Sequence, residues 1–439
     1  MKLPSVPAYS HEDVVKALEL LSQEPVRSET EDFNRHYLHW EELRRHRPLA
    51  ADPLLIWILM KIFRQNSMRT IPFADWHIGF NLGDACQRAL HTLDKTAGGS
   101  LVGLLESAGQ DRDRYILNAL MEEAIASSQI EGAATTRRVA KQMLRENRRP
   151  RTRDERMIVN TYLTMKMVVE RKQQPLSVDL ILELHGMITA GTLDDPADAG
   201  AFRQNDEIRV VDQHGTVLHT PPPYTQIPRL MDELCTFIDS ESDTFLHPVV
   251  KGIVLHFLIA FIHPFNDGNG RTARTLFYWF LLREDYWLFE YMPISRAIHQ
   301  KRGQYKRAFL YTESDDLDLT YFIRYNLDVI IETLAEVRSY IERTQMEQRR
   351  VIGLIEGSDE LNLRQVEILK RLMRAPDRTI GIREVMGIFG VAYATARADL
   401  FRLEELGYLV RLKMGKSLLF LYNRQKMTEG GPLPAASDE

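Results

Sequence analysis

The chain has 439 residues, a hydrophobic content of 44% and a net charge of −5 at pH 7. This length suits two or three domains of about 150 residues each, and the hydrophobic content argues against intrinsic disorder. Two cysteines, Cys86 and Cys235, exclude a disulfide framework and a multi-cysteine metal site, and they are typical of a reducing cytoplasm. The N-terminus has no apolar signal region, and the apolar stretch from Pro53 to Phe63 is shorter than the ~20 residues that cross a bilayer. We therefore expect a cytoplasmic protein without a membrane span.

Residues 1–110 are predicted to form an N-terminal helical region, interrupted at Gly98-Gly99. His36, His39 and His46 could suggest a metal site, but they lie among arginines and glutamates, which favours a solvated, charged helix. The aromatic residues of this region indicate a core or a docking surface. No chemistry is predicted here.

A helix is predicted over residues 112–132, and its end carries a carboxylate. Residues of buried type recur along it at spacings of four, three and four: Leu117, Met121, Ala124 and Ser128. Continuing by three residues reaches Glu131, with Gly132 where a helix would end. A carboxylate in line with a buried stripe needs a cationic partner, because burying it unpaired is costly. Ser127 lies one turn earlier on the same side. From the residues alone, that partner could simply be Arg137 or Arg138.

The segment after this helix reads as a basic connection, two helices and a hairpin. Glu146 to Arg156 is arginine-rich and turn-rich, and helices are predicted over 156–171 and 176–189. Two short β-prone runs flank Asp212 to Gly215 and predict a surface hairpin. A helix over 227–238 then leads to the centre of the chain.

The centre is the segment from His263 to Arg274. An apolar helix precedes it, Gly268-Asn269-Gly270 interrupts the chain, and a second helix is predicted to begin near Arg271. Free N–H groups and the positive dipole at a helix N-terminus favour an anion, and glycines let phosphate oxygens approach the backbone. This arrangement predicts a polyphosphate site.

Side chains of the same segment supply the chemistry expected around a polyphosphate. Arg271 and Arg274 are three residues apart and share one helix face. Asp267 is a hard oxygen ligand that fits Mg²⁺, and His263 has a reference pKa suited to a general base. Each residue alone has an ordinary explanation, such as a capping histidine or an Asn-Gly turn. Together, in one register, they favour the functional interpretation.

The ordered string His-x-Phe-x-Asp-Gly-Asn-Gly-Arg-x-x-Arg, from His263 to Arg274, resembles the signature of the Fic family. The resemblance implies an α-helical enzyme that moves AMP from ATP onto a hydroxyl side chain of a target protein. His263 would take the hydroxyl proton, Asp267 would hold the metal, and Phe265 would anchor the core. The phosphates would be bound by Gly268, Asn269, Gly270, Arg271 and Arg274. The kinase-like Doc branch departs from the string in the glycine turn, and this chain does not.

Two further segments resemble parts of the same family. The string from Ser127 to Gly132 is similar to the inhibitory motif Ser/Thr-x-x-x-Glu-Gly/Asn, in which the glutamate pairs with the second arginine of the signature, here Arg274. The predicted hairpin matches the place of the family's flap, whose edge docks the target by strand addition. These roles are implied by the resemblance alone.

The chain after the centre is predicted to hold packing helices and a separate C-terminal domain. Tyr305 could border the nucleotide, although an amphipathic helix alone explains it, and a long helix is predicted over 321–341. Gly357-Ser358-Asp359 marks a boundary. Residues 361–425 then carry twelve Lys or Arg and six Asp or Glu and resemble a winged helix-turn-helix. Four side chains lie off its predicted core and could meet DNA, although such modules also serve protein contacts: Tyr393, Thr395, Arg397 and Arg402.

The predicted fold is mainly α: a Fic-type helical core with a β-hairpin flap, plus the C-terminal winged helix. The predicted domains are residues 1–110, residues 111–345 with the inhibitory helix 112–132, and residues 361–425. The leading function is Mg²⁺-dependent AMP transfer from ATP to a Ser, Thr or Tyr hydroxyl, restrained by Glu131. The alternatives are removal of AMP, with Glu131 activating water, and a nucleotide-sensing DNA-binding regulator. The sequence leaves the oligomeric state open, a homodimer included.

Overall fold

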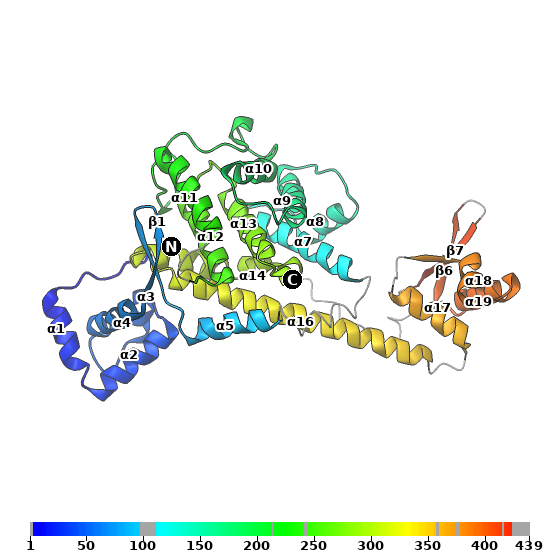
Figure 1. Cartoon of the computed structure of the whole chain (residues 1–439), viewed down its shortest axis with the longest axis horizontal. Helices are drawn as coiled ribbons and strands as arrows, with labels where there is room; N and C mark the ends of the chain where they lie inside the picture. The colour runs from blue at the N-terminus through cyan, green and yellow to red at the C-terminus, as the bar shows by residue number, and fades with distance from the viewer. Residues whose placement is uncertain are drawn as a thin grey trace. The chain divides into compact units, whose positions relative to one another are not determined.

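The computed structural model describes residues 3–96, 111–212, 214–240, 245–356, 360–374, 378–414 and 417–423. The chain divides into two compact units, Met1–Ala97 with Asn118–Leu334 and Gly98–Leu117 with Ala335–Glu439. Helices dominate the first unit, and the second ends in helices and a small sheet, so the prediction of a mainly α fold is confirmed (Figure 1). The predicted breaks at Gly98-Gly99 and Gly357-Ser358-Asp359 lie outside the described residues.

The N-terminal part of the first unit contains five helices and a β-hairpin that was not predicted. The hairpin is β1 (Arg69–Phe73) and β2 (Trp76–Phe80), with Ile71 paired to Ile78. Alternate residues, among them Phe73 and Phe80, are buried, which is the period of a strand. Pro72 is tolerated because β1 has only one paired neighbour. The helices are α1 (His11–Leu20), α2 (Glu24–His36), α3 (Trp40–His46), α4 (Pro53–Ser67) and α5 (Asp84–Lys95).

The prediction of three solvated histidines is wrong for His39. Its side chain is fully buried and stacks on Tyr311, with ring centroids 4.0 Å apart. It also caps α3, because Nδ1 accepts a hydrogen bond from the Glu41 N–H at 3.2 Å. His36 and His46 are exposed as predicted. Among the described residues, no group of three or more His, Cys, Asp or Glu side chains could hold a metal ion.

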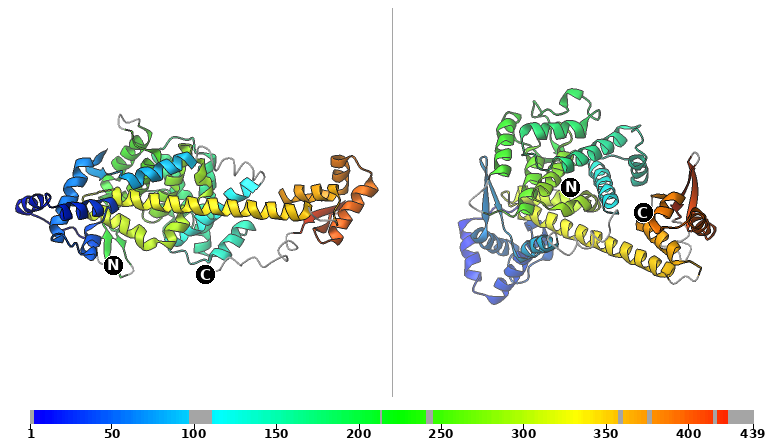
Figure 2. Two further views of the ribbon diagram at one scale, coloured as in Figure 1. Left: turned by 90° about the horizontal axis from the view of Figure 1, so that it is seen from below. Right: turned by 45° about the vertical axis from the view of Figure 1, so that its right-hand side comes forward.

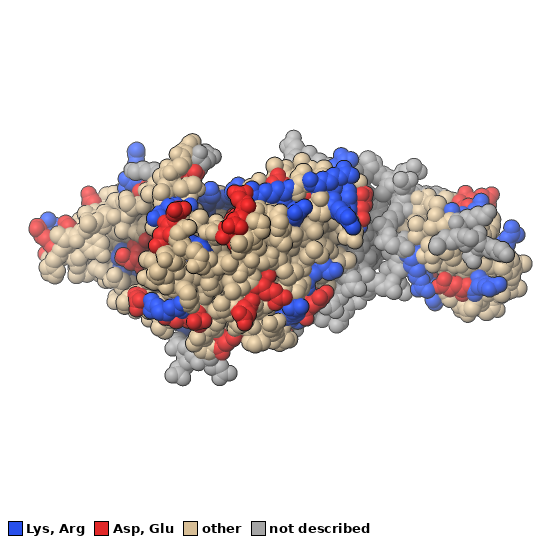
Figure 3. All heavy atoms as spheres, turned by 90° about the horizontal axis from the view of Figure 1, so that it is seen from above, with Lys and Arg blue, Asp and Glu red and all other residues tan. Residues whose placement is uncertain are grey.

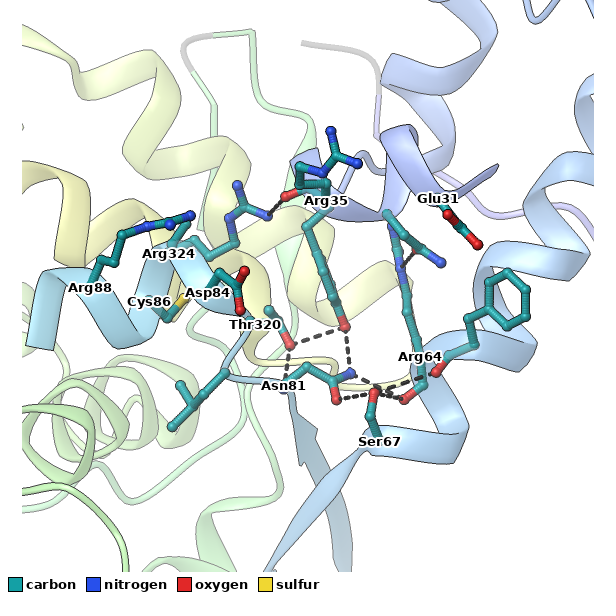
Figure 4. Close-up of a pocket in the computed structure, with 16 residues that line it drawn as sticks. Glu31, Arg35, Arg64, Ser67, Asn81, Asp84, Cys86, Arg88, Thr320 and Arg324 are labelled. Carbon is teal, nitrogen blue, oxygen red and sulfur yellow. Dashed lines mark hydrogen bonds between the residues drawn. The ribbon is translucent and has the colours of Figure 1, made fainter. Parts of the chain in front are cut away.

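A polar network ties the N-terminal part to the rest of the first unit. Tyr37 and Asn81 of this network line a cavity of about 450 Å³ beside the start of α5 (Figure 4). The Tyr37 hydroxyl donates to Asp318 at 2.7 Å, and Asn81 donates to that hydroxyl at 3.0 Å. Lys61 pairs with Asp315 at 2.6 Å, and both side chains are buried. Residues on both sides of the predicted boundary near residue 110 therefore pack in one unit.

The rest of the first unit is built around α12 (Pro248–Ile262) and α13 (Asn269–Arg283), the two helices that flank the central segment. Eleven residues of α12 are buried, on all sides of the helix, as its continuous apolar sequence predicts. The surrounding helices are α8 (Arg137–Arg145), α9 (Arg153–Glu170), α10 (Val178–Thr189), α11 (Ile227–Asp239), α14 (Ile294–Gln300) and α15 (Arg302–Ser314), together with α7 (Asp111–Ile130) from Asn118 on and α16 (Thr320–Glu356) as far as Leu334. Short 3-10 turns lie at η2 (Pro196–Asp198), η3 (Tyr224–Gln226) and η4 (Trp287–Tyr291).

Two helices differ from their predicted form. Leu117 was expected in the buried stripe of α7, but it is 41% exposed, because the buried face begins at Ala119. Met121, Ala124 and Ser128 are buried as predicted. The helix predicted over 321–341 is part of α16, one uninterrupted helix of 37 residues (Figure 2).

The predicted surface hairpin is present as β3 (Val210–Val211) and β4 (Val217–His219), an antiparallel pair with an irregular register. Its turn residue Gln213 lies outside the described residues. Charges of both signs are interspersed over the face of the molecule in Figure 3, as the small net charge implies. None of the helices in the described ranges is long and apolar enough to cross a membrane.

The second unit contains the winged helix that the sequence predicted. Its helices are α17 (Leu363–Arg374), α18 (Ile382–Phe389) and α19 (Tyr393–Glu405), and its sheet has the order β5-β7-β6. The wing is β6 (Leu409–Met414) and β7 (Ser417–Tyr422), with Gly415 and Lys416 outside the described residues. The first strand, β5 (Thr379–Gly381), was not predicted. Ala396, Leu400 and Leu403 are buried, as expected for the core face of α19.

Candidate active site

The turn between α12 and α13 takes its shape from two residues with positive φ. His263 ends α12 in the left-handed conformation, with φ 51°, and Gly268 begins α13 with φ 86°. A Cβ at position 268 would lie only 2.7 Å from Thr189 and 3.2 Å from His185, so glycine is required there by space as well as by φ. Gly268 provides no side-chain cap for α13. The first-turn N–H groups of α13 are therefore available to a ligand.

Two polar side chains hold the turn in place. Asn269 accepts a hydrogen bond from the Phe265 N–H at 2.9 Å and donates one to the Phe265 carbonyl at 2.8 Å. The Asn269 side chain is therefore occupied by the backbone of Phe265, and only the main-chain N–H of Asn269 can make the predicted phosphate contact. His185, on α10, stacks on Phe265 with ring centroids 3.7 Å apart. Phe265 is fully buried, as a core anchor should be.

His185 was missed in the sequence, although a histidine within an apolar helix was a visible signal. Its Nδ1 accepts a hydrogen bond from the Gly200 N–H at 3.0 Å. Its Nε2 lies 2.9 Å from the Asp267 carbonyl, and since a carbonyl only accepts, Nε2 carries the proton. Burial lowers the pKa of His185 to about 4, so the ring is neutral near pH 7. It fixes the turn without adding charge.

His263 is oriented as a base. Its Nδ1 lies 3.2 Å from the Ala260 carbonyl, so Nδ1 carries the proton and Nε2 keeps a lone pair. Nε2 has no hydrogen-bond partner in the part of the chain that the structure describes. Burial lowers the pKa of His263 to about 4, partly offset by the Ala260 carbonyl. The imidazole is therefore neutral at pH 7, and its free nitrogen can accept a proton.

Both arginines of the segment are buried with unused donors. Arg271 is fully buried and donates Nη1 to the Ile188 carbonyl at 3.2 Å, while Nε and Nη2 have no hydrogen-bond partner among the described residues. Arg274 is 2% exposed, and its Nη1 has no such partner either. Burial lowers the pKa of Arg271, opposed by the charge of Asp267. Buried, unpaired donors are costly, and an anion beside α13 would satisfy them.

Arg274 is bound by residues from the end of α7. Its Nε donates to the Ser127 hydroxyl at 2.9 Å, and Nη2 donates to the Ser127 carbonyl at 2.9 Å and to Glu131 at 2.8 Å. The Glu131 side chain is 28% exposed and lies against Gly270, where a Cβ would overlap its carboxylate. Burial raises the pKa of Glu131, but the charge of Arg274 outweighs this and holds it below its usual value. The carboxylate thus lies beside the first turn of α13.

The ordinary alternative for Glu131, a pair with Arg137 or Arg138, does not occur among the described residues. Arg137 and Lys141 both bind Glu122, at 2.7 Å each. Glu131 and Arg274 are 143 residues apart, and the structure brings them together as the family resemblance implied.

Asp267 has one oxygen available for a cation. Its Oδ1 accepts a hydrogen bond from the Gly268 N–H at 2.6 Å, and Oδ2 lies 3.7 Å from Arg271 and 3.8 Å from Arg153. The side chain is 46% exposed. A single accessible carboxylate beside an anion site fits Mg²⁺, which usually takes one or two carboxylates together with phosphate oxygens and water.

Tyr305, considered above as a border of the nucleotide, is a buried residue of α15. Its hydroxyl lies 2.8 Å from Nε2 of His256, a buried histidine of α12. Burial raises the pKa of Tyr305 to about 12, opposed by the charge of Arg274. Tyr305 therefore lies in the buried interior, close enough to Arg274 for the charge of the arginine to act on its hydroxyl.

The sequence model described as the Fic/DOC family matches residues 175–281, which span α10 to α13 and hence the turn. Residues 175–281 are a Fic/DOC family domain. A second model, the DeoR-like helix-turn-helix domain, matches residues 364–417. These matches agree with the family resemblance of the central segment and with the winged helix of the second unit.

Proteins named protein adenylyltransferase Fic match this chain over part of its length. The one from Drosophila virilis is 32% identical over 179 residues, which is 40% of this chain and 33% of that protein. The one from Drosophila mojavensis is 33% identical over 179 residues, 40% of this chain and 32% of that protein. The chain thus spans about a third of the curated relatives it matches.

Solved structures are similar at lower identity. A Fic family protein from Desulfovibrio desulfuricans G20 is 19% identical with a TM-score of 0.49, covering 76% of this chain and 96% of that one. Fic-1 from C. elegans, residues 134–508, is 18% identical with a TM-score of 0.49, covering 76% and 92%.

Acid should destabilise the first unit of the protein, because burial lowers the pKa of four histidines. His39, His185 and His263 have pKa values of about 4, and His256 of about 3. Below about pH 6.5 the unfolded chain binds these protons and the folded chain does not, so the free energy of unfolding falls as pH drops toward 4, by about 1.4 kcal/mol per pH unit for each histidine. Urea unfolding between pH 7.5 and 4.5 measures this, and a His39→Phe variant should show a shallower slope. A free energy that does not fall would contradict it.

Proposed function

We propose that this protein transfers AMP from ATP to a Ser, Thr or Tyr hydroxyl of a target protein, and that Glu131 restrains the reaction. The observation that carries the proposal is the free, unprotonated Nε2 of His263 beside buried arginine donors at the N-terminus of α13. The curated relatives that match the chain are named protein adenylyltransferases, which supports this chemistry. The cysteine content favours a cytoplasmic location, and the target stays unnamed.

The proposed reaction uses each residue at a stated atom. Nε2 of His263 accepts the proton of the target hydroxyl, and the hydroxyl oxygen forms a bond to the α-phosphorus of ATP. The bond from the α-phosphorus to its bridging oxygen breaks, and pyrophosphate leaves. Arg271 and Arg274 hold the phosphate oxygens with donors that the fold leaves unused. The N–H groups of Asn269 and Gly270 add the helix N-terminus to this site.

Mg²⁺ fits the residues present. Asp267 would hold it through Oδ2, and the ion would neutralise charge on the phosphates.

The inhibited form follows from the pair of Glu131 and Arg274. The pair occupies one donor of the arginine and places a negative charge beside the phosphate site. ATP would meet this charge with its β- and γ-phosphates, so the α-phosphorus would be displaced from the line of attack. Removal of AMP, with Glu131 activating water, uses the same geometry and is the alternative within the enzyme class.

The test is detection of AMP on protein. The Glu131→Gly chain is incubated with Mg²⁺ and isotope-labelled ATP, and its peptides are read by mass spectrometry. We expect auto-modification by one AMP per modified hydroxyl. A folded Glu131→Gly chain that binds ATP and labels neither itself nor any protein of a cell extract would overturn AMP transfer.

A second candidate function is DNA binding, favoured by the winged helix. Tyr393 is 52% exposed in the first turn of α19, and Arg397 is exposed one turn later. The DeoR-like match covers this helix. Under this hypothesis the first unit binds ATP as a sensor, and ATP binding changes the affinity of the protein for DNA.

Duplex DNA binding by the full chain should weaken steeply with salt. Each phosphate contact contributes a slope of about −0.9 in log affinity against log salt concentration. Arg397→Glu should weaken binding at least about tenfold at low salt, whereas Arg371→Glu, whose wild-type residue pairs with Glu367 on α17, should not. Fluorescence anisotropy with a labelled random duplex measures both. Absence of binding at low salt would leave only protein contacts for this domain.

A further inference from the structure

The flap is fastened to the backbone of the catalytic turn by two buried side chains that the sequence analysis passed over. Here the flap means residues 203–222, which include β3 and β4. Arg203 lies at its start and His219 near its end. Both reach the segment from Phe261 to Pro264, which contains the base.

Arg203 binds the turn and the flap at the same time. Its backbone N–H donates to the Pro264 carbonyl at 2.9 Å, and its Nε donates to the His263 carbonyl at 3.0 Å. The rest of the guanidinium binds the flap: Nη1 donates to the Asn205 carbonyl at 2.8 Å and to Asp206 at 2.9 Å, and Nη2 donates to the Pro222 carbonyl. The side chain is 1% exposed. Lysine keeps the charge but cannot reproduce this fork.

His219 makes the second attachment from β4. Its Nε2 lies 2.7 Å from the Phe261 carbonyl, and its Nδ1 lies 2.7 Å from Glu313 on α15. Both ring nitrogens are therefore engaged, and the ring links the Phe261 carbonyl to the Glu313 carboxyl group. The Phe261 ring, 4.9 Å from that of His219, also packs edge-on against Trp76 of β2 at 5.0 Å.

The segment from Phe261 to Pro264 includes a residue in an unfavourable backbone conformation. His263 has φ 51°, in the left-handed region that residues other than glycine seldom adopt. Such a conformation persists where the surroundings fix it. Two of the carbonyls from Phe261 to His263 are bound by flap side chains, so these bonds hold the backbone that carries the imidazole, while Nδ1 of the ring lies against the Ala260 carbonyl. A displacement of about 1 Å at a reacting group can lower a rate by roughly 10²-fold.

We propose that Arg203 and His219 are positioning residues that couple the flap to His263. A target strand bound to the flap would then also fix the orientation of Nε2 of His263. The inference rests on the proposed function, since it assigns these residues to the same reaction. It predicts loss of kcat without loss of ATP binding. Replacing a residue needed only for folding would lower kcat and ATP binding together.

The experiment measures auto-modification kinetics in the Glu131→Gly background. His219→Ala and Arg203→Lys should lower kcat about 10- to 100-fold and leave KM for ATP within about twofold. His219→Gln, whose amide can still donate to the Phe261 carbonyl, should recover most of the loss. His77→Ala and Arg229→Ala are the controls, because both residues are exposed on the same unit and Arg229 pairs with Asp75 and Glu233. Unchanged kcat in both test variants, or a rise in KM for ATP alone, would overturn the proposal.

Hydrogen–deuterium exchange tests the coupling without chemistry. In His219→Ala, the amides of Ile262, His263 and Phe265 should exchange faster together with those of the flap. Faster exchange confined to the flap would refute the coupling. If the Glu131→Gly parent transfers no AMP, the proposed function fails and the exchange result alone decides the coupling. If Arg203→Lys does not fold, His219→Ala and Glu313→Gln decide it.

Discussion

Replacing Glu131 by glycine is expected to raise AMP transfer far more than it raises ATP affinity. In the structure, Glu131 binds Arg274 at 2.8 Å and lies against Gly270 at the start of α13. Removing the carboxylate frees the guanidinium and removes a negative charge from the phosphate site. The rate increase comes from a better geometry of bound ATP, so we expect it to appear in kcat.

The size of the gain is bounded by a two-state argument. Taking an equilibrium from almost closed to almost open corresponds to about 10⁴-fold, or about 5.5 kcal/mol. Glu131 is 28% exposed, so part of the pair's energy is screened by water, and we expect on the order of 10²- to 10³-fold. Arg274→Ala should be inactive even with Glu131→Gly, because the phosphate then loses its clamp.

The matched control for this prediction is Glu122→Gln. Glu122 is a buried carboxylate of the same helix, but its partners are Arg137 and Lys141. Loss of its charge perturbs α7 without touching Arg274. Auto-modification and ATP binding are measured side by side in the wild type, both single variants, the double variant and this control. Equal rates for the wild type and Glu131→Gly would reduce Glu131 to a structural carboxylate.

The part of the site that could be predicted from the sequence lies within one short segment. The end of α12, the turn and the start of α13 contain His263, Asp267, Gly268, Arg271 and Arg274. Their relative placement therefore follows from local geometry. The structure brings them together as expected. The pairing of Glu131 with Arg274 spans 143 residues, and only the family resemblance suggested it.

The residues that support this segment could not be predicted, because each comes from another element and acts on backbone atoms. His185 binds the Asp267 carbonyl, Arg203 the His263 carbonyl and His219 the Phe261 carbonyl. A carbonyl is present at every position, so even the visible signal at His185, a histidine within an apolar helix, did not show which carbonyl it would bind. The same holds for His39, whose burial depends on a stack with Tyr311 of α15.

The second large effect is expected for His263→Ala in the Glu131→Gly background, which should lower transfer by roughly 10²- to 10⁴-fold while ATP still binds. Nε2 of His263 is the free, unprotonated nitrogen of the turn. Because burial lowers its pKa to about 4, the base form prevails throughout the neutral range, and kcat should be flat from about pH 6 to 8 on account of this residue. Single-turnover AMP transfer and equilibrium ATP binding measure the two parts.

Alanine at this position carries a backbone cost, because His263 has φ 51°. His263→Asn is therefore made in parallel: asparagine tolerates the left-handed conformation and lacks a base. His36→Ala removes an exposed histidine from the same unit and should transfer AMP at the parent rate. Loss in both His263 variants, with ATP affinity retained, assigns the proton transfer to the imidazole. Undiminished transfer by either folded His263 variant would exclude His263 as the base and would leave proton removal to water or to the target hydroxyl's own surroundings.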